Sequence, residues 1–309
     1  MIIKSIPKRW RLLSGQNNWQ NLLKPLDSDL QQYVIHYGAM AQATYDTFNS
    51  NRRSKFAGSS RYSRRNLFSR VGLVKGNPFK YEAVKYIYAT SNICVPESFI
   101  VKSLSAKKRG VLSEVQKQVE KYKDEEISIT VAGHSLGAAL ATLNAADIVC
   151  NSYNKLSSQP NKTCPVTAFN FGSPLVGDWN FRRALRSMND LHILNVYNFP
   201  DIIPHLPPLF DYTGVGVALT VDSTMSPFLK PGDVSTWHNL EAAYLHPLAI
   251  ARPGDIVERD IALVNKKSSA LRDEYLIPTY WWCEKNKGMV QLENGSWILH
   301  DHETDDDDP

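Results

Sequence analysis

The 309-residue chain has no long apolar run, and this absence excludes several classes of protein. No stretch approaches the roughly 20 apolar residues that a membrane-spanning helix needs. The first ten residues lack the apolar core and the small-residue cleavage site of a secretory signal, so we expect no such signal. A soluble, cytoplasmic protein is the resulting expectation.

Cysteine and net charge are also low. The four cysteines are widely spaced and form no Cys-x-x-Cys pair, which favours free thiols in a reducing compartment; they are Cys94, Cys150, Cys164 and Cys283. A formal charge of +4 is small for this length and gives no reason to expect a nucleic-acid partner. It suits an anionic membrane surface only weakly.

The chain does contain enough apolar sequence for a large core, since 43% of its residues are hydrophobic. We predict a single α/β domain over residues 1–309. Within it, residues 1–85 form a helical and basic region, and residues 301–309 form an acidic, disordered tail. Metal binding by the histidines and aspartates near this tail is not expected, because little else in the sequence supports a metal site.

Predicted strands and helices alternate through the middle of the chain. Runs of β-branched and apolar residues predict strands, and apolar residues at helical spacing predict helices. The expected strands cover residues 127–132, 165–171 and 191–197, and the expected helices cover residues 10–50, 111–123, 138–146 and 179–187. This alternation is typical of an α/β fold with a mostly parallel central sheet flanked by helices.

The flanking segments are less regular. Residues 51–70 are polar and basic, and we interpret them as a solvated loop, with a patch that faces phospholipid headgroups as the alternative. Residues 200–235 are rich in Pro and Gly and are predicted to form long loops. A strand at 86–89, a helix at 260–273 and a β-hairpin over 289–299 that turns at Asn294–Gly295 complete the prediction.

The sequence Gly133-His-Ser-Leu-Gly137 has the Gly-x-Ser-x-Gly pattern of a nucleophile elbow. It follows a predicted strand and opens a small-residue helix, which is the context that this motif requires. In such a turn the strained backbone lifts the Ser135 hydroxyl out of the sheet, and Gly133 and Gly137 let neighbouring segments approach closely. The amide of Leu136, at the positive end of the helix, can then donate to a developing oxyanion. Ser135 is therefore the candidate nucleophile.

A serine nucleophile needs a base, and the base needs an acid that orients it. In this kind of fold the chain order is serine, acid, histidine, with both partners on loops after later strands. Asp201 comes just after the strand predicted at 191–197 and is the preferred acid. Asp178 follows an earlier strand, and Asp211 and Asp222 lie in loops, so these three stay as alternatives.

The base must follow Asp201, and His238 and His246 are the main candidates on one predicted helical segment. His238 lies near the start of that segment and is preferred, whereas His246 precedes a proline and is expected to pack. His205 is close to Asp201 in a Pro-rich loop, and His134 is held inside the elbow. The remaining histidines are expected to be structural: His36, His192, His300 and His302.

These residues resemble the class 3 lipases, and closely the plant phospholipases A1 of type II. The resembling segments span nearly the whole chain and include residues 10–15, 121–131, 133–144, 169–178, 200–204, 238–246 and 259–265. The resemblance implies an α/β-hydrolase fold and cleavage of the sn-1 acyl ester of glycerolipids without a metal or other cofactor. It places the serine, acid and base of the family on Ser135, Asp201 and His238.

One segment of that family has no counterpart in this chain. The resemblance implies a long stretch between residue 105 and the helix near Val111, with sheet strands and a Trp-Arg-Gly-Thr motif that supplies a second oxyanion donor. Here residues 100–110 run straight into the helix, and no Arg-Gly-Thr occurs anywhere. Leu136 then provides the one assignable oxyanion amide, and the strand at 127–132 is expected to lose a sheet neighbour.

The sequence therefore predicts a phospholipid acylhydrolase that uses a Ser-His-Asp mechanism and makes transient contact with membrane surfaces. The alternative is a catalytically impaired or non-catalytic lipid-binding relative, produced by loss of the oxyanion-hole segment. The alternative is chemically reasonable because removing one oxyanion donor typically lowers turnover by about 10²–10³-fold.

Overall fold

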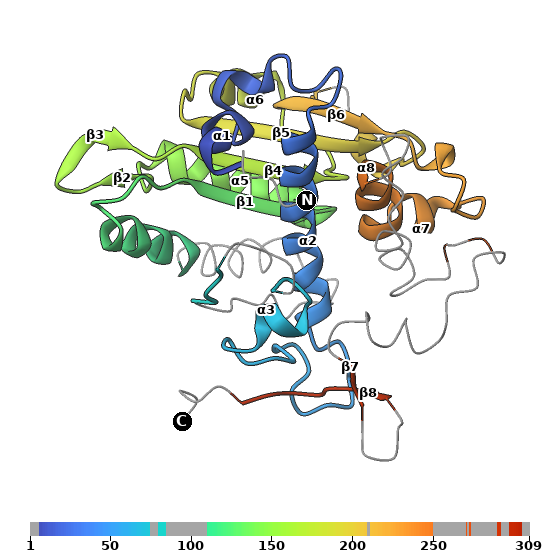
Figure 1. Cartoon of the computed structure of the whole chain (residues 1–309). Helices are drawn as coiled ribbons and strands as arrows, with labels where there is room; N and C mark the ends of the chain where they lie inside the picture. Colours follow the sequence, from blue (N-terminus) through green and yellow to red (C-terminus); the bar gives the residue numbers. More distant parts are fainter. Residues whose placement is uncertain are drawn as a thin grey trace. The chain divides into compact units, whose positions relative to one another are not determined.

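The computed structural model describes residues 6–74, 80–84, 110–208, 211–249, 270, 272, 289–291 and 297–304 (Figure 1). The chain divides into two compact units. The first contains residues 1–41 and 112–275, and the second contains residues 42–111 and 276–309. The single-domain organisation expected from the sequence stays a prediction.

A four-stranded parallel sheet forms the centre of the first unit, with the strand order β1-β4-β5-β6. Its strands are β1 (Ile129–His134), β4 (Val166–Phe171), β5 (Leu191–Asn198) and β6 (Val217–Val221). Helices cover this sheet, so the predicted α/β class is confirmed (Figure 1). The three predicted strands are those that became β1, β4 and β5.

The fourth strand, β6, corrects the prediction that residues 200–235 are loop. Its β-branched residues Val217, Thr220 and Val221 favour a strand, but glycines and prolines surround this five-residue run. Sequence pattern alone gives such a short run little weight. Pairing with residues Leu194 to Asn198 of β5 stabilises this strand, and the local sequence does not indicate that pairing.

Helices cover both faces of the sheet because successive strand residues point to opposite sides. Phe169 and Phe171 of β4 lie in a core shared with α1, α2 and η4. Val166 and Ala168 of the same strand pack with α5, α6 and the helical residues 110–121. All six residues of β4 are buried, and its two polar residues, Thr167 and Asn170, donate hydrogen bonds to buried partners.

The remaining elements of the first unit are mostly short. They are α1 (Ile6–Leu13), η1 (Gln16–Trp19), α2 (Ser28–Thr47, which extends into the second unit), α5 (Leu136–Cys150), β2 (Lys155–Leu156), β3 (Gln159–Thr163), α6 (Trp179–Arg186), η2 (Ile203–His205), η3 (Ser223–Met225), α7 (Val234–Trp237), η4 (Leu240–Leu245) and α8 (His246–Ala249). The small-residue helix predicted after the elbow is confirmed as α5, whose Ala138 and Ala145 are fully buried. The helix η4 has π-helical geometry.

The first strand differs from its neighbour in burial. Within the described residues β1 pairs with β4 on one side only, and Ile129 to Ala132 are half-buried. This is the arrangement expected if the sheet lacks a strand beyond β1. No helix in the described ranges combines the length and the apolar character needed to cross a membrane.

The second unit contains α3 (Leu67–Arg70) and the antiparallel pair β7 (Met289–Gln291) and β8 (Trp297–Leu299). The predicted hairpin is therefore present as two paired strands, while its turn at Asn294–Gly295 lies outside the described residues. The strand predicted at 86–89 and the helix predicted at 260–273 also lie outside them.

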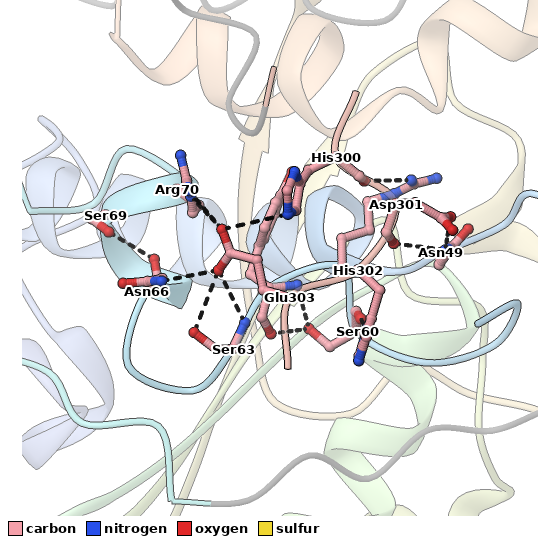
Figure 2. Close-up of polar contacts among 12 residues, drawn as sticks. Asn49, Ser60, Ser63, Asn66, Ser69, Arg70, His300, Asp301, His302 and Glu303 are labelled. Atoms are coloured by element: carbon pink, nitrogen blue, oxygen red, sulfur yellow. Dashed lines mark hydrogen bonds and ion pairs between the residues drawn. The ribbon is translucent and has the colours of Figure 1, made fainter. Parts of the chain in front are cut away.

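Residues 300–303 make defined contacts with residues 49–70 (Figure 2). The carboxylate of Glu303 accepts hydrogen bonds from Ser63, Asn66 and Arg70. The Asp301 carboxylate accepts from Asn49. The expectation of a disordered tail is corrected for residues 301–303, because these polar contacts and the stacking of the His302 ring on Phe56 hold them. Residues 305–309 lie outside the described ranges.

The basic segment 51–70 is mainly turns and bends, as the loop prediction requires. Arg52 and Arg53 are exposed, in agreement with a solvated segment. Arg61 departs from it, because its side chain is buried and donates to the carbonyl of His300 at 3.0 Å. The segment therefore contains exposed arginines that face solvent and a buried arginine, Arg61, that stabilises the fold of the second unit.

Candidate active site

The elbow forms at the junction of β1 and α5, where Ser135 is the single residue between the two elements. Its backbone has φ 58° and ψ −130°, a conformation that non-glycine residues seldom adopt and that costs of the order of 1–3 kcal/mol. Backbone hydrogen bonds hold it there: the Ser135 amide donates to Phe171 at 2.9 Å, and the Ser135 carbonyl accepts from the amides of Ala138 at 2.9 Å and Ala139 at 3.3 Å. The strained turn predicted from the motif is present.

The two glycines of the motif differ in what they allow. A Cβ atom on Gly133 would lie 2.3 Å from the carbonyl oxygen of Gly137, so only glycine fits at this position. A Cβ atom on Gly137 would meet nothing within 4 Å. The prediction that both glycines permit close approach is therefore confirmed for Gly133 and wrong for Gly137, which lies within the first turn of α5.

Three of the predicted side chains converge although they are far apart in the sequence. His238 Nε2 lies 2.7 Å from Ser135 Oγ, and His238 Nδ1 lies 2.6 Å from Asp201 Oδ2. Asp201 follows β5, and its amide donates to Asn198, the last residue of that strand, at 3.0 Å. The structure therefore brings Ser135, His238 and Asp201 into one hydrogen-bonded chain.

His238 does not lie on a continuous helical segment, which corrects the sequence prediction. The helix α7 ends at Trp237, His238 has φ −96° and ψ 3°, and Asn239 caps η4 by accepting from the Ala242 amide. The carbonyl of Trp237 accepts from Asn198 Nδ2 at 2.9 Å. This contact ties the end of α7 to the end of β5 and holds His238 beside Asp201.

The carboxylate of Asp201 is fully buried, and protein groups donate hydrogen bonds to both of its oxygens. Its side chain has no exposed surface, and it accepts from His238, from the hydroxyl of Tyr244 and from the amide of Ile203. Burial alone raises the pKa of Asp201, but these hydrogen bonds outweigh burial and leave the pKa below its ordinary value. Asp201 is therefore an anion at neutral pH and orients His238 with its proton on Nδ1.

The oxyanion side of the site is less complete. Leu136 is the first residue of α5, where a backbone amide has no acceptor within the helix, and its side chain is 67% exposed. The positive end of α5 lies at the same residue. The amide of Leu136 is thus in a suitable position for the predicted role, and that role stays a prediction.

The alternatives considered in the sequence have other contacts. Asp178 caps α6 by accepting from the Phe181 amide, and Asp222 caps η3 in the same way. His246 is 2% exposed, and its Nε2 lies 2.8 Å from Ser226 Oγ, as expected for a packed residue. His205 belongs to η2, and Asp211 lies in a turn.

His134 is held inside the elbow as predicted, with Nε2 2.8 Å from the carbonyl of His238. Burial, with a smaller contribution from His238, lowers the pKa of His134 to about 4, so the ring is neutral near pH 7. The described part of the chain holds no group of three or more His, Cys, Asp or Glu side chains placed to bind a metal ion. Tyr244 is the residue of the site that the sequence did not single out.

Comparison with known proteins agrees with this geometry. Residues 70–211 match the family Lipase (class 3). The chain is 41% identical to phospholipase A1-IIgamma of Arabidopsis thaliana, over 100% of this chain and 96% of that protein. It belongs to the class 3 lipase family. Phospholipase A1-II 6 of Oryza sativa subsp. japonica is 38% identical, over 97% of this chain and 96% of its own length.

As a class 3 lipase the chain belongs to the carboxylic ester hydrolases, and its parallel sheet with flanking helices is the predicted α/β-hydrolase arrangement. A triacylglyceride lipase structure from Rhizomucor miehei aligns with a TM-score of 0.34 at 26% identity, over 40% of this chain and 44% of that chain. The assignment to the lipases rests on the sequence relatives.

The lipase relatives are longer than this chain. The alignment with the Arabidopsis thaliana protein extends over 404 residues, whereas this chain has 309, so that protein contains a long stretch without a counterpart here. This agrees with the segment inferred to be absent between residues 105 and 111. The likenesses do not test which side chains react, so the roles of Ser135, Asp201, His238 and Leu136 stay predictions.

Proposed function

We propose that this lipase hydrolyses the sn-1 acyl ester of phospholipids through an acyl-enzyme on Ser135. The observation that carries the proposal is the continuous contact from Ser135 Oγ through the two ring nitrogens of His238 to Asp201. The name of the relatives, phospholipase A1, supports the substrate class and the sn-1 position.

The first half of the reaction forms the acyl-enzyme. Asp201 keeps the His238 proton on Nδ1, which leaves Nε2 free to accept the proton of the Ser135 hydroxyl. Ser135 Oγ attacks the ester carbonyl carbon, and the amide of Leu136 with the positive end of α5 stabilises the negative oxygen. The bond to the glycerol oxygen then breaks, and that oxygen takes the proton from His238 Nε2.

The second half releases the fatty acid. A water molecule gives one proton to His238 Nε2 and attacks the acyl carbon, and the bond to Ser135 Oγ breaks as Oγ takes that proton back. The ion pair between the protonated ring and Asp201 stabilises both transition states. No step requires a metal ion or another cofactor. Transient contact with membrane surfaces and a cytoplasmic location belong to the same proposal.

Hydrolysis of phosphatidylcholine that carries different labelled acyl chains at sn-1 and sn-2 tests the proposal. The wild-type protein should release the sn-1 label first, and Ser135→Ala should release neither. Ser187→Ala, which changes an exposed serine at the end of α6, is the matched control and should behave as wild type. Equal release of both labels contradicts the sn-1 assignment, and unchanged release by Ser135→Ala contradicts the mechanism.

A second function is favoured by one observation, the absent Arg-Gly-Thr segment: a lipid-binding relative with little or no turnover. A fluorophosphonate separates the two functions, because an activated Ser135 Oγ displaces fluoride and forms a stable bond to phosphorus. Rapid labelling that Ser135→Ala abolishes supports the hydrolase. Binding of phosphatidylcholine vesicles without labelling supports the non-catalytic relative.

A further inference from the structure

We propose that Tyr244 is a positioning residue for the acid–base pair, and that its hydroxyl holds Asp201 in the orientation that serves His238. The inference rests on the proposed function, since it concerns the same reaction. It adds a fourth side chain whose part in that reaction neither the motif nor the chain order indicates.

The contacts of the Asp201 carboxylate carry the inference. The oxygen Oδ2 accepts from His238 Nδ1 and also from the hydroxyl of Tyr244. The oxygen Oδ1 accepts from the amide of Ile203 at 2.9 Å. With donors on both oxygens and no exposed side-chain surface, the carboxylate cannot rotate without breaking a buried hydrogen bond. Tyr244 is the one side-chain hydroxyl among these donors.

The position of Tyr244 is closely fixed. The residue is fully buried in the core formed by α1, α2 and the sheet. A Cβ atom on Gly172, which has φ +59°, would lie 2.5 Å from the Tyr244 hydroxyl oxygen and 3.1 Å from Cε1 of His238. The absence of a side chain at Gly172 therefore creates the space in which the hydroxyl and the imidazole lie side by side.

One short stretch of chain carries both the base and this tyrosine. His238 immediately precedes Asn239, which caps η4, and Tyr244 lies within η4. Asp201 comes from a different element, the end of β5. The stretch therefore presents two donors, a ring N–H and a phenol O–H, to a single carboxylate oxygen.

Tyr244 acts as a permanently neutral donor. Burial, with a further contribution from the neighbouring Asp201, raises the pKa of Tyr244 well above its ordinary value. Burial also raises the pKa of Tyr197, and the pKa of His134 is lowered to about 4, so these neighbours do not titrate near pH 7. A change in the acid limb of the pH profile therefore reports on the pair formed by His238 and Asp201.

The donor from Tyr244 has a predictable effect on that pair. By stabilising the negative charge on Oδ2, it weakens the attraction of Asp201 for the proton on His238. Without it, protonated His238 is more stable, so the acid limb of kcat/KM should move to higher pH. The carboxylate is also less well oriented, so kcat should fall while KM changes little.

Tyr244→Phe removes the hydroxyl and keeps the ring, and its kcat should fall by about 10- to 100-fold, as for the loss of a hydrogen bond to a charged group. Tyr33→Phe is the matched control, because Tyr33 is also buried and loses a hydrogen bond to Ser14, 2.9 Å long, without touching Asp201. It should leave kcat and the pH profile unchanged. Rates are expressed per mole of Ser135 that a fluorophosphonate titrates, so loss of folded protein does not mimic a catalytic effect.

Incorporation of 2,3-difluorotyrosine at position 244 strengthens the hydrogen-bond donor instead of removing it and nearly keeps the shape of the side chain. The fluorinated phenol is a stronger donor, so the acid limb should move to lower pH, and this arm decides the question if Tyr244→Phe does not fold. If the wild-type protein is active and the acid limbs of the variants at position 244 coincide with that of the wild type, the proposed role of Tyr244 is wrong. Lack of activity in the wild type itself would instead contradict the proposed function.

Discussion

Two carboxylates with little exposed side-chain surface, one in each unit, have similar surroundings and different chemistry. Asp201 in the first unit has no exposed side-chain surface and accepts from His238, Tyr244 and a backbone amide. Glu303 in the second unit is 10% exposed and accepts from Arg70, Asn66 and Ser63 (Figure 2). In both cases burial raises the pKa, and the hydrogen bonds outweigh burial and lower it.

The difference lies in the partner on the other side of the hydrogen bond. An arginine guanidinium keeps its charge at any ordinary pH, so the pair of Arg70 with Glu303 holds structure and does not exchange a proton. A histidine is the side chain suited to exchanging a proton near neutral pH, and the second ring nitrogen of His238 faces the hydroxyl of Ser135. A buried anion thus becomes part of a reaction when its partner can exchange a proton, and burial or a lowered pKa alone does not identify it.

We expect the largest effect on kcat when Asp201 is replaced and almost none when Glu303 is replaced. Asp201→Asn keeps the shape of the side chain but should lower kcat by about 10³–10⁴-fold, because the amide favours the wrong tautomer of His238. Steady-state hydrolysis of a soluble nitrophenyl ester measures this. Glu303→Gln, the matched amide substitution in the second unit, should leave kcat within about twofold of wild type. A comparable loss in both variants would contradict the distinction.

Glu303→Gln should instead affect stability. Removing the charge weakens the contact with Arg70 and leaves that guanidinium poorly paired, which should lower the free energy of unfolding by about 1–3 kcal/mol. Urea unfolding followed by circular dichroism measures the change. Because the folded-state pKa of Glu303 is lowered, its contribution is present above the unfolded pKa near 4.5 and is lost as the pH falls through the folded value. The two proteins should therefore converge in stability under strongly acidic conditions.

His246 is a buried histidine that, among the described residues, contacts the Ser226 hydroxyl and no carboxylate, and it sharpens the comparison. Burial lowers its pKa to about 4, so the folded chain binds fewer protons than the unfolded chain between pH 6.5 and about 4. As the pH decreases across this window, the free energy of unfolding should decrease, and His246 should contribute at most about 1.4 kcal/mol per pH unit to this decrease. His246→Gln should reduce that slope in urea titrations between pH 7 and pH 4.5. An unchanged slope would show that His246 does not titrate there.

The smallest effect is expected at Asp178, the exposed carboxylate that the sequence left as an alternative acid. Its side chain caps α6 and does not contact His238. Asp178→Asn retains the capping acceptor and should leave the melting temperature and kcat nearly unchanged, while Asp178→Ala should lower the melting temperature slightly at unchanged kcat. A large fall in kcat for either variant would reopen the choice of acid.

Much of the first unit can be predicted from the sequence because its signals are local. The strand before Ser135 and the small-residue helix after it are visible in the residue types, and the chain order then indicates Asp201 and His238. The strand β6 is not visible, because its five residues lie among glycines and prolines and gain their hydrogen bonds from β5. Local pattern carries no information on such a partner.

Tyr244 and Glu303 show a second limit. Tyr244 has the sequence context of an ordinary core aromatic, and only its contact with Asp201, 43 residues earlier, distinguishes it. Glu303 lies in a polar tail without apolar residues, and its partner Ser63 is 240 residues away. In both cases the fold brings together two side chains, and no periodicity, spacing or composition in the sequence indicates that they are in contact.

The π-helical winding of η4 has a consequence for how this chain tolerates change. Tyr244 follows His238 by six residues along a stretch that is wound more loosely than an α-helix. An ordinary α-helix turns by roughly 100° per residue and a π-helix by less, so a π-helical stretch contains one residue more than the α-helix that would replace it. Deleting one residue between Asn239 and Tyr244 would therefore let an α-helix form and would leave Tyr244 pointing in nearly the same direction, toward Asp201. We expect such a deletion to preserve more turnover than the same deletion in the regular helix α5, where every following side chain would rotate by roughly 100°.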